Sequence, residues 1–277
     1  MTVATALQQG QQLLADGAIA EPRLTAEVLL GHALRRERVY LYTHPEHELS
    51  EIEWIHYGRY LHERLAGKPT QYITRVQEFY GRPFRVSPDV LIPRPETEHV
   101  IEKALSLGLK PRMALDIGCG SGALAVTAAL ELHCPVVATD ISAAALRVAA
   151  ANARDLKAQV EFVCCDLASA FRPVPSFDLI VSNPPYIPEP ELAGIQREVR
   201  DFEPRVALVG GERGHEMYLR IIPQAEALLV PGGWLIFEIG YRAADAVQAA
   251  FDPEHWSGVE VMPDLAGLPR VLSAQRK

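Results

Sequence analysis

The spacing of apolar residues changes along this chain and divides it into a helical front part and a longer part with alternating elements. Up to about residue 70 the apolar positions lie at helical intervals, as at Leu24, Val28 and Leu29, with Gly17 and Pro22 as breakers before them. Beyond residue 112, short apolar runs alternate with longer amphipathic stretches. This pattern predicts a small helical bundle followed by an α/β domain.

One helix of the front part has both of its ends marked in the sequence. Ser50-Glu51-Ile52-Glu53 has the form of a capping box, in which serine and the last glutamate satisfy each other's backbone donors. Gly67 and Pro69 mark the end of this helix. Its apolar stripe is formed by Trp54, Tyr57, Leu61 and Leu65. We expect residues 1–70 to form a helical domain that docks a substrate, since no catalytic constellation stands out in it.

Residues 71–98 have a different character and are expected to connect the two domains. Residues 71–74 and 84–86 flank Gly81-Arg82-Pro83, a pattern that predicts a β-hairpin. Residues 92–98 then form a proline-stiffened turn that leads into a helix over about 99–107. The aromatic residues Phe79, Tyr80 and Phe84 make this connector too apolar for a free linker.

Residues 99–277 alternate strands and helices, which predicts a mainly parallel, doubly wound sheet. Residues 192–202 are predicted as a single helix with Leu192, Ile195, Val199 and Phe202 on one face, and Pro231-Gly232-Gly233 as a turn into the next strand. Two short strands close together at the end predict an antiparallel hairpin beside the sheet. The predicted strands are 113–117, 136–139, 160–163, 177–182, 234–239, 259–262 and 270–273; the other helices are 123–132, 142–154, 216–229 and 243–251.

The charge balance bears on possible partners. The net charge is −8, divided as −2 over residues 1–70, 0 over 71–98 and −6 over 99–277, so no segment is a basic arm. Proteins that grip nucleic acids usually show a basic face, because phosphate contacts supply most of their non-specific affinity. We therefore expect no stable complex with nucleic acid.

The lack of a recognisable secretion signal and the spacing of the cysteines favour an intracellular protein. No apolar run approaches the ~20 residues that span a bilayer, and the N-terminus shows no basic segment followed by an apolar core. The cysteines Cys119, Cys134, Cys164 and Cys165 show no C-x-x-C spacing. We expect a reduced, cytoplasmic protein with no membrane partner and no bound metal.

Four polar features follow predicted strands directly, at their carboxyl ends. They are Asp116 with the glycine loop Gly118-Cys119-Gly120-Ser121-Gly122, and then Asp140, Asp166 and Asn183. In doubly wound sheets, ligands bind outside the carboxyl ends of the strands, where the strand order switches. The glycines allow close approach of the backbone, and the following helix presents N–H groups. The sequence thus predicts a ligand site at this edge of the sheet.

The glycine loop alone leaves two cofactors open. Alanine at position 123 is permitted as the third small residue of a dinucleotide fingerprint, and Asp140, 18 residues after Gly122, can take ribose hydroxyls of either NAD or S-adenosylmethionine. Asp116 and Asp166 favour S-adenosylmethionine. An acid before the loop could attract its cationic amino group, and an acid after the third strand could accept from its adenine amino group.

Ser182-Asn183-Pro184-Pro185-Tyr186 is a rigid turn at the end of the fourth predicted strand. The Asn183 side chain and the Pro184 carbonyl offer two acceptors, which suit a planar NH2 group with two donors, while Tyr186 can pack on that group. An isolated turn of this kind is more often structural. Beside a sulfonium cofactor it is expected to orient a nitrogen toward the methyl group, so that no acid–base pair is required.

Several segments together resemble the N5-glutamine methyltransferases that modify peptide chain release factors. The glycine loop and the Asn-Pro-Pro-Tyr turn are shared with adenine-N6 methyltransferases, whereas residues 92–98, the helical front domain and Phe202-Glu203-Pro204 are more specific. The resemblance covers nearly the whole chain, through residues 92–98, 116–122, 182–187, 198–200, 202–204, 231–233, 238–240 and 264–267.

The resemblance implies a seven-stranded, Rossmann-like class I methyltransferase domain over residues 99–277, a helical domain over 1–70 and a connecting hairpin over 71–98. It implies methyl transfer from S-adenosylmethionine to the glutamine of the Gly-Gly-Gln loop of class-1 release factors, a modification that modulates translation termination. Cys119 stands where threonine is frequent, and Ala243 where glutamine is common. The implied cofactor contacts are Gly118, Cys119, Gly120, Ser121, Gly122, Asp140, Leu167 beside Asp166, and Asn183, and Asp116 is expected to join them because of its charge; the implied substrate contacts are Asn183, Pro184, Pro185, Tyr186 and Phe79.

Two other functions stay open at the level of sequence. A nucleic-acid amino methyltransferase, such as an adenine-N6 enzyme, could use the same turn, and the acidic balance disfavours it. A cofactor-binding protein without catalysis, such as an assembly factor, is disfavoured by the intact Asn183 and Tyr186.

Overall fold

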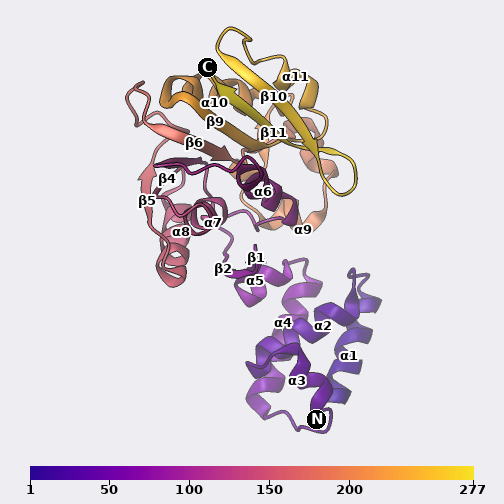
Figure 1. Ribbon diagram of the computed structural model, residues 1–277. Helices are drawn as coiled ribbons and strands as arrows, with labels where there is room; N and C mark the ends of the chain where they lie inside the picture. The colour runs from indigo at the N-terminus through magenta and orange to yellow at the C-terminus, as the bar shows by residue number, and fades with distance from the viewer. The chain divides into compact units, whose positions relative to one another are not determined.

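The computed structural model describes all 277 residues, and the chain forms two compact units (Figure 1). The first unit is Met1–Val76 together with Gln196–Phe202, and the second is Gln77–Ile195 together with Glu203–Lys277. The chain therefore passes from one unit to the other three times. No helix has both the length and the apolar character needed to cross a membrane.

The first unit is a helical bundle. The predicted capping box is present, with the Ser50 N–H donating to Glu53 at 2.8 Å and the Glu53 N–H donating to the Ser50 hydroxyl at 3.4 Å. Of the predicted apolar stripe, Tyr57 and Leu61 are buried, and both pack in the core of this unit. Its helices are α1 (Val3–Asp16), α2 (Pro22–Leu34), α3 (Arg38–Thr43), α4 (Glu51–Leu65), α5 (Thr70–Thr74) and α9 (Arg197–Phe202).

The prediction of a strand at residues 71–74 is wrong, because these residues form helix α5. Tyr72 and Ile73 are adjacent and both buried, which a helical turn allows and strand alternation does not. The first strand of the hairpin lies further along the chain than predicted: β1 (Val76–Phe79) and β2 (Arg82–Arg85) are joined by two residues. Both of these, Tyr80 and Gly81, have positive φ, as the tight two-residue hairpin turn requires.

The second unit is built on a seven-stranded sheet in the order β10-β11-β9-β6-β3-β4-β5, which confirms the predicted fold class. Five neighbouring strands, β9, β6, β3, β4 and β5, run parallel to one another. The predicted C-terminal hairpin extends the sheet beyond β9, with β11 antiparallel to β9 and β10 antiparallel to β11. The strands are β3 (Ala114–Ile117), β4 (Val136–Asp140), β5 (Val160–Cys164), β6 (Phe177–Ser182), β9 (Leu229–Glu238), β10 (Trp256–Pro263) and β11 (Pro269–Arg276).

Helices cover both faces of this sheet because its central strands are apolar on both sides. Ala114 packs in one core cluster with α6 (Glu98–Ser106), α7 (Ala123–Glu131) and α8 (Ala143–Leu156). The next residue, Leu115, packs in the other cluster with α10 (Glu216–Leu228) and α11 (Ala244–Gln248). The strand order reverses at β3, with β4 on one side and β6 on the other, so the switch point lies at the carboxyl end of β3.

Two other sequence predictions need correction. Residues 192–202 do not form one helix: the 3₁₀ helix η2 (Glu189–Gly194) ends at Ile195, whose backbone is extended, before α9 begins. Pro231-Gly232-Gly233 lies inside β9 rather than in a turn before it, at an irregularity in the pairing with β6. The remaining short elements are η1 (Pro95–Thr97), β7 (Ile187–Pro188), η3 (Arg205–Ala207) and β8 (Val209–Gly211), with β7 and β8 forming a parallel pair.

Candidate active site

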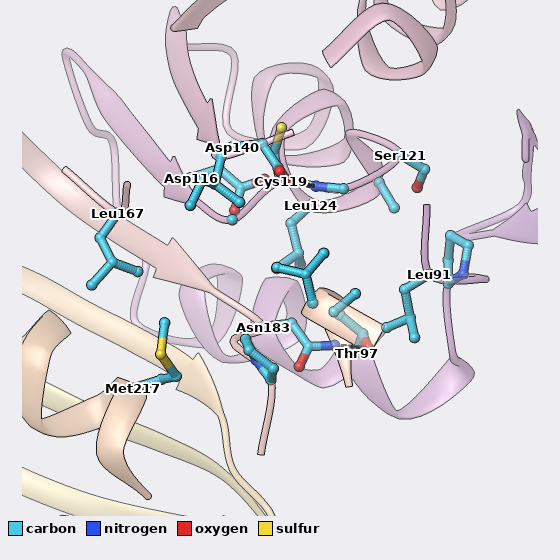
Figure 2. Close-up of a pocket in the computed structure, with 18 of the residues that line it drawn as sticks. Leu91, Thr97, Asp116, Cys119, Ser121, Leu124, Asp140, Leu167, Asn183 and Met217 are labelled. Carbon is cyan, nitrogen blue, oxygen red and sulfur yellow. Dashed lines mark hydrogen bonds between the residues drawn. The ribbon is translucent and has the colours of Figure 1, made fainter. Parts of the chain in front are cut away.

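A pocket of about 520 Å³ opens at the carboxyl ends of β3, β4 and β6, where the strand order switches (Figure 2). This is the size of a typical small-molecule site. Most of the residues predicted to contact a cofactor line it together. The lining comprises Leu91, Pro93, Thr97, Asp116, Gly118, Cys119, Gly120, Ser121, Ala123, Leu124, Asp140, Ile141, Asp166, Leu167, Asn183, Pro185, Arg205, Val206, Ala207, Val209, Met217 and Arg220.

The glycine loop takes a conformation that its glycines make possible. Gly120 and Gly122 have φ of 54° and 80°, in the region that disfavours residues with a Cβ. At Gly122 a Cβ would also lie 3.0 Å from the Cβ of Ala149 in α8. The loop therefore packs tightly on α8 while its backbone faces the pocket.

Asp140 fastens the glycine loop to the start of α8. Its Oδ2 accepts from the Gly120 N–H at 2.9 Å, and its Oδ1 accepts from the Ser142 N–H at 2.8 Å. Ser142 in turn caps α8 by accepting from the Ala145 N–H at 3.1 Å. Each carboxylate oxygen keeps further lone pairs, so Asp140 can hold the loop and still accept from a ligand hydroxyl.

Asp116 is a buried acid with an unusual environment. It is fully buried at the pocket wall, and neither of its carboxyl oxygens has a hydrogen-bond partner of good geometry within the protein. Burial raises the pKa of Asp116 to about 8, the Ala125 N–H offsets part of this rise, and the charge of Asp140 adds to it. A buried acid without a partner at a pocket is a candidate for binding a cationic ligand group.

Asp166 and Leu167 follow β5 and line the pocket on its far side. The carboxylate of Asp166 pairs with the Arg220 guanidinium at 2.5 Å, and both side chains are about half exposed. Leu167 has a positive φ of 53° and is buried, so its backbone is held in a conformation that is uncommon for leucine. One carboxylate oxygen of Asp166, Oδ2, therefore accepts from Arg220, and the other oxygen remains for a ligand.

The Asn-Pro-Pro-Tyr turn follows β6 and is fixed by two side-chain hydrogen bonds. Asn183 donates through Nδ2 to the Thr97 hydroxyl at 3.0 Å, and the Tyr186 hydroxyl donates to the Glu238 carboxylate at 3.1 Å. Asn183 and Pro185 line the pocket, whereas Pro184 and Tyr186 do not. Burial and the negative charge of Glu238 raise the pKa of the Tyr186 hydroxyl, so it stays protonated.

Phe79 lies in the hydrophobic core of the second unit. It is 1% exposed and meets Phe84 edge-on, with ring centroids 5.9 Å apart. It is not among the residues that line the pocket. Its placement gives no support to the role in the pocket wall that the resemblance implied.

Sequence reasoning missed several residues of the site. Thr97 lines the pocket and contacts Asn183, and Glu238 contacts both Thr97 and Tyr186. Both residues lie in segments that carried the resemblance, but no pattern in those segments indicates a chemical role for them. Arg220 and Met217 of α10 also line the pocket, and nothing in the helical pattern of that segment marks them.

The fold and this site together define a class I, Rossmann-like methyltransferase. A family model described as a methyltransferase domain matches residues 114–202. Among solved structures, a methyltransferase from Pyrococcus furiosus aligns with a TM-score of 0.56 at 20% identity, over 72% of this chain and 90% of that one. The Thermus thermophilus 16S rRNA N2 G1207 methyltransferase, solved with AdoMet and guanosine, aligns with a TM-score of 0.53 at 20% identity, over 73% and 50% of the two chains.

Sequence comparisons identify the family more closely. The PrmC N-terminal domain model matches residues 5–74. A release factor glutamine methyltransferase of Koribacter versatilis is 48% identical over 100% of this chain and 99% of its own, and that of Nitratidesulfovibrio vulgaris is 42% identical over 98% and 94%. This chain belongs to the family of release factor glutamine methyltransferases.

Proposed function

We propose that this protein transfers a methyl group from S-adenosylmethionine to the side-chain nitrogen N5 of the glutamine in the Gly-Gly-Gln loop of class-1 release factors. The supporting observation is that Asn183, at the carboxyl end of β6, lines the same pocket as the glycine loop and the unpartnered Asp116. The proposed setting is the cytoplasm, with a release factor as protein partner and no stable complex with nucleic acid or membrane.

The residues of the pocket fit the proposed cofactor. S-adenosylmethionine, when bound, supplies a methyl group on a positively charged sulfur. Asp116 would hold the cationic amino group, because neither of its buried oxygens has a hydrogen-bond partner of good geometry within the protein. Asp140 would accept from ribose hydroxyls, and Leu167 would pack on the adenine while the second oxygen of Asp166 accepts from its amino group. The backbone of Gly118, Cys119, Gly120 and Ser121, which line the pocket, would face the cofactor, and Gly122, which does not line it, would hold the loop against α8.

The substrate amide would be held by the Asn-Pro-Pro-Tyr turn. Asn183 Oδ1 and the Pro184 carbonyl would each accept one N–H, Tyr186 would pack on the planar amide, and Pro185 would line the approach. An amide nitrogen is a poor nucleophile because its lone pair is delocalised, so its orientation toward the methyl group matters more than a base. Orientation is worth up to ~7–11 kcal/mol in favourable systems. The proton can leave the nitrogen after the methyl group has been transferred.

Incubation with labelled S-adenosylmethionine and a purified release factor tests this function. We expect label on the release factor and none on a control whose loop glutamine is replaced. Label that persists on the control, or that appears only on DNA or RNA, would reject the proposal, and the second outcome would establish a nucleic-acid amino methyltransferase instead.

The role of Asn183 has its own test. We expect Asn183→Ala to lower kcat by about 100-fold or more, by analogy with the loss of one oriented polar group in other enzymes. Cofactor binding, measured by calorimetry, should persist and show that the variant is folded. A near-normal kcat in a folded, cofactor-binding variant would remove Asn183 from the mechanism.

The first unit is proposed to dock the release factor. Its helical bundle shows no catalytic constellation, and the family model that matches it is separate from the methyltransferase domain. Substitutions of exposed side chains of this bundle that contact the release factor should therefore raise the KM for the release factor more than they change kcat.

A further inference from the structure

A chain of hydrogen bonds links Asn183 to an acid that the sequence did not connect with the site. Asn183 Nδ2 donates to Thr97 Oγ1 at 3.0 Å, and Thr97 Oγ1 donates to Glu238 Oε2 at 2.6 Å. Thr97 is 4% exposed and Glu238 is 1% exposed, so the bond between these two residues is shielded from water, whereas Asn183 is half-buried at the pocket. Figure 2 shows Thr97 and Asn183 side by side in the pocket.

The direction of these bonds fixes which end of the Asn183 amide faces Thr97. A threonine hydroxyl has one hydrogen, and here the Glu238 carboxylate accepts it. Thr97 can then only accept from Asn183, and Nδ2 is the only donor of that side chain. The opposite atom, Oδ1, accepts no hydrogen bond from the protein and is left as the acceptor that Asn183 offers.

The surroundings of Glu238 favour its acting as an acceptor. The Tyr186 hydroxyl donates to Oε1, and a guanidinium nitrogen of Arg270 lies 3.9 Å from the same oxygen. Arg270 is itself held by Asp264 at 3.0 Å. Burial raises the pKa of Glu238, and its contacts with Thr97, Arg270 and Tyr186 counteract that rise. Glu238 thus anchors both Asn183, through Thr97, and Tyr186.

We propose that Thr97 and Glu238 are positioning residues that hold the Asn183 amide with Oδ1 toward the substrate. This inference rests on the proposed function, in which Oδ1 accepts an N–H of the glutamine amide. A rotated Asn183 would present its own NH2 group to the substrate NH2 group, donor against donor. Neither Thr97 nor Glu238 takes part in the bond changes; both act through Asn183, and Glu238 also through Tyr186.

Three variants test the chain of hydrogen bonds. Thr97→Val keeps the shape and removes the hydroxyl, so we expect kcat to fall by about 100-fold, with the KM for S-adenosylmethionine changed by less than about threefold. Thr97→Ser keeps the hydroxyl and should retain kcat within about threefold. Thr127→Val is the matched control, because Thr127 is a fully buried threonine whose hydroxyl has no partner. It should leave kcat unchanged.

Glu238→Gln tests the same chain without removing a heavy atom. Arg270 and Tyr186 both face Oε1, so the new amide should place its oxygen toward them and its NH2 group toward Thr97. Thr97 would then accept from that group and turn its hydrogen toward Asn183, which favours the rotated amide. We expect a loss of kcat comparable with that of Thr97→Val, in a protein that still binds the cofactor.

A double-mutant cycle separates positioning from a merely structural role. If Thr97 acts only through Asn183, adding Thr97→Val to Asn183→Ala should lower kcat by less than about twofold further. Independent, multiplicative losses would overturn the inference, as would a normal kcat in both Thr97→Val and Glu238→Gln. If the wild-type protein fails to methylate the release factor glutamine, the proposed function itself fails, which the wild-type arm reveals separately.

Discussion

The guanidinium of Arg94 pairs with the carboxylate of Glu203, 109 positions further along the chain. Glu203 also accepts from the Ile92 N–H at 3.2 Å and is buried, with a 6% exposed fraction. Glu203 thus connects its own segment to residues 92–98, which the sequence marked separately. The segment 92–98 includes Thr97, which lines the pocket.

Removing Arg94 should be costly because Arg94 forms an ion pair with the buried carboxylate of Glu203. We expect Arg94→Ala to lower the free energy of unfolding by about 2 kcal/mol, or roughly 4–8 °C in Tm. Thermal unfolding followed by circular dichroism measures it. Arg242→Ala is the matched control, since Arg242 and Glu191 form an exposed pair at 2.9 Å; its effect should stay under about 0.5 kcal/mol. Equal effects of the two substitutions would contradict the expectation.

Cofactor affinity should depend on pH through Asp116. Its pKa of about 8 means that most molecules carry a protonated Asp116 at pH 7, whereas a cationic amino group binds the ionised form. Affinity should therefore rise with pH up to about 8 and fall above it as the amino group of the cofactor loses its proton, and binding at pH 7 should release about one proton. Calorimetry in buffers of different ionisation enthalpy measures that proton. Asp116→Asn should bind more weakly and release none; proton release that persists in this variant would assign it to another group.

The two loop glycines should respond differently to alanine. Gly120→Ala meets open space and suffers only the positive φ, a cost of about 1 kcal/mol. Gly122→Ala has the same backbone penalty, and its Cβ also lies 3.0 Å and 3.2 Å from the Cβ and Cα of Ala149. Urea unfolding should show a larger loss for Gly122→Ala. If the two variants lose the same stability, the close contact of the loop with Ala149 does not add to the cost of a Cβ at position 122.

The four cysteines should differ in reactivity. Cys119 and Cys134 are buried; burial raises the pKa of the Cys134 thiol to about 11 and that of Cys119 well above its usual range. Because the thiolate is the reactive form, iodoacetamide at pH 8 should label the exposed Cys164 and spare both buried residues. Mass spectrometry identifies the labelled peptides, and labelling in guanidinium chloride is the control in which all four should react. Rapid labelling of Cys119 in the native protein would show that the glycine loop opens.

The parts of the fold that follow simple periodicity could be predicted from the sequence. The strand at residues 177–182 was predicted with the bounds that the structure shows, because its apolar run ends sharply at two prolines. Residues 71–74 could not be assigned in this way, since four residues are too few to distinguish period 2 from period 3.6. The split between η2 and α9 depends on the extended backbone at Ile195, which leaves no mark in the spacing of apolar residues.

The site was predictable where it follows strand ends and not where it depends on distant pairs. Asp116, Asp140 and Asn183 could be placed together because parallel strands bring their carboxyl ends to one edge. The bond between Thr97 and Glu238 joins residues 141 positions apart, and no periodic pattern encodes such a pair. The ion pair between Asp166 and Arg220 could not be predicted either. Arg220 lies in α10, and the sequence does not show which face of that helix points toward the pocket.

The placement of α9 affects how the protein folds during synthesis, since α9 lies in the segment Gln196–Phe202 that belongs to the first unit. Arg64 of α4 forms an ion pair with Glu198 of α9 at 2.7 Å, and the Ala66 carbonyl accepts from Arg197 at 3.3 Å. A nascent chain of residues 1–76 therefore lacks one piece of its own bundle. The bundle reaches its final form only after the ribosome has made residue 202, when four of the seven strands of the large sheet have already been translated.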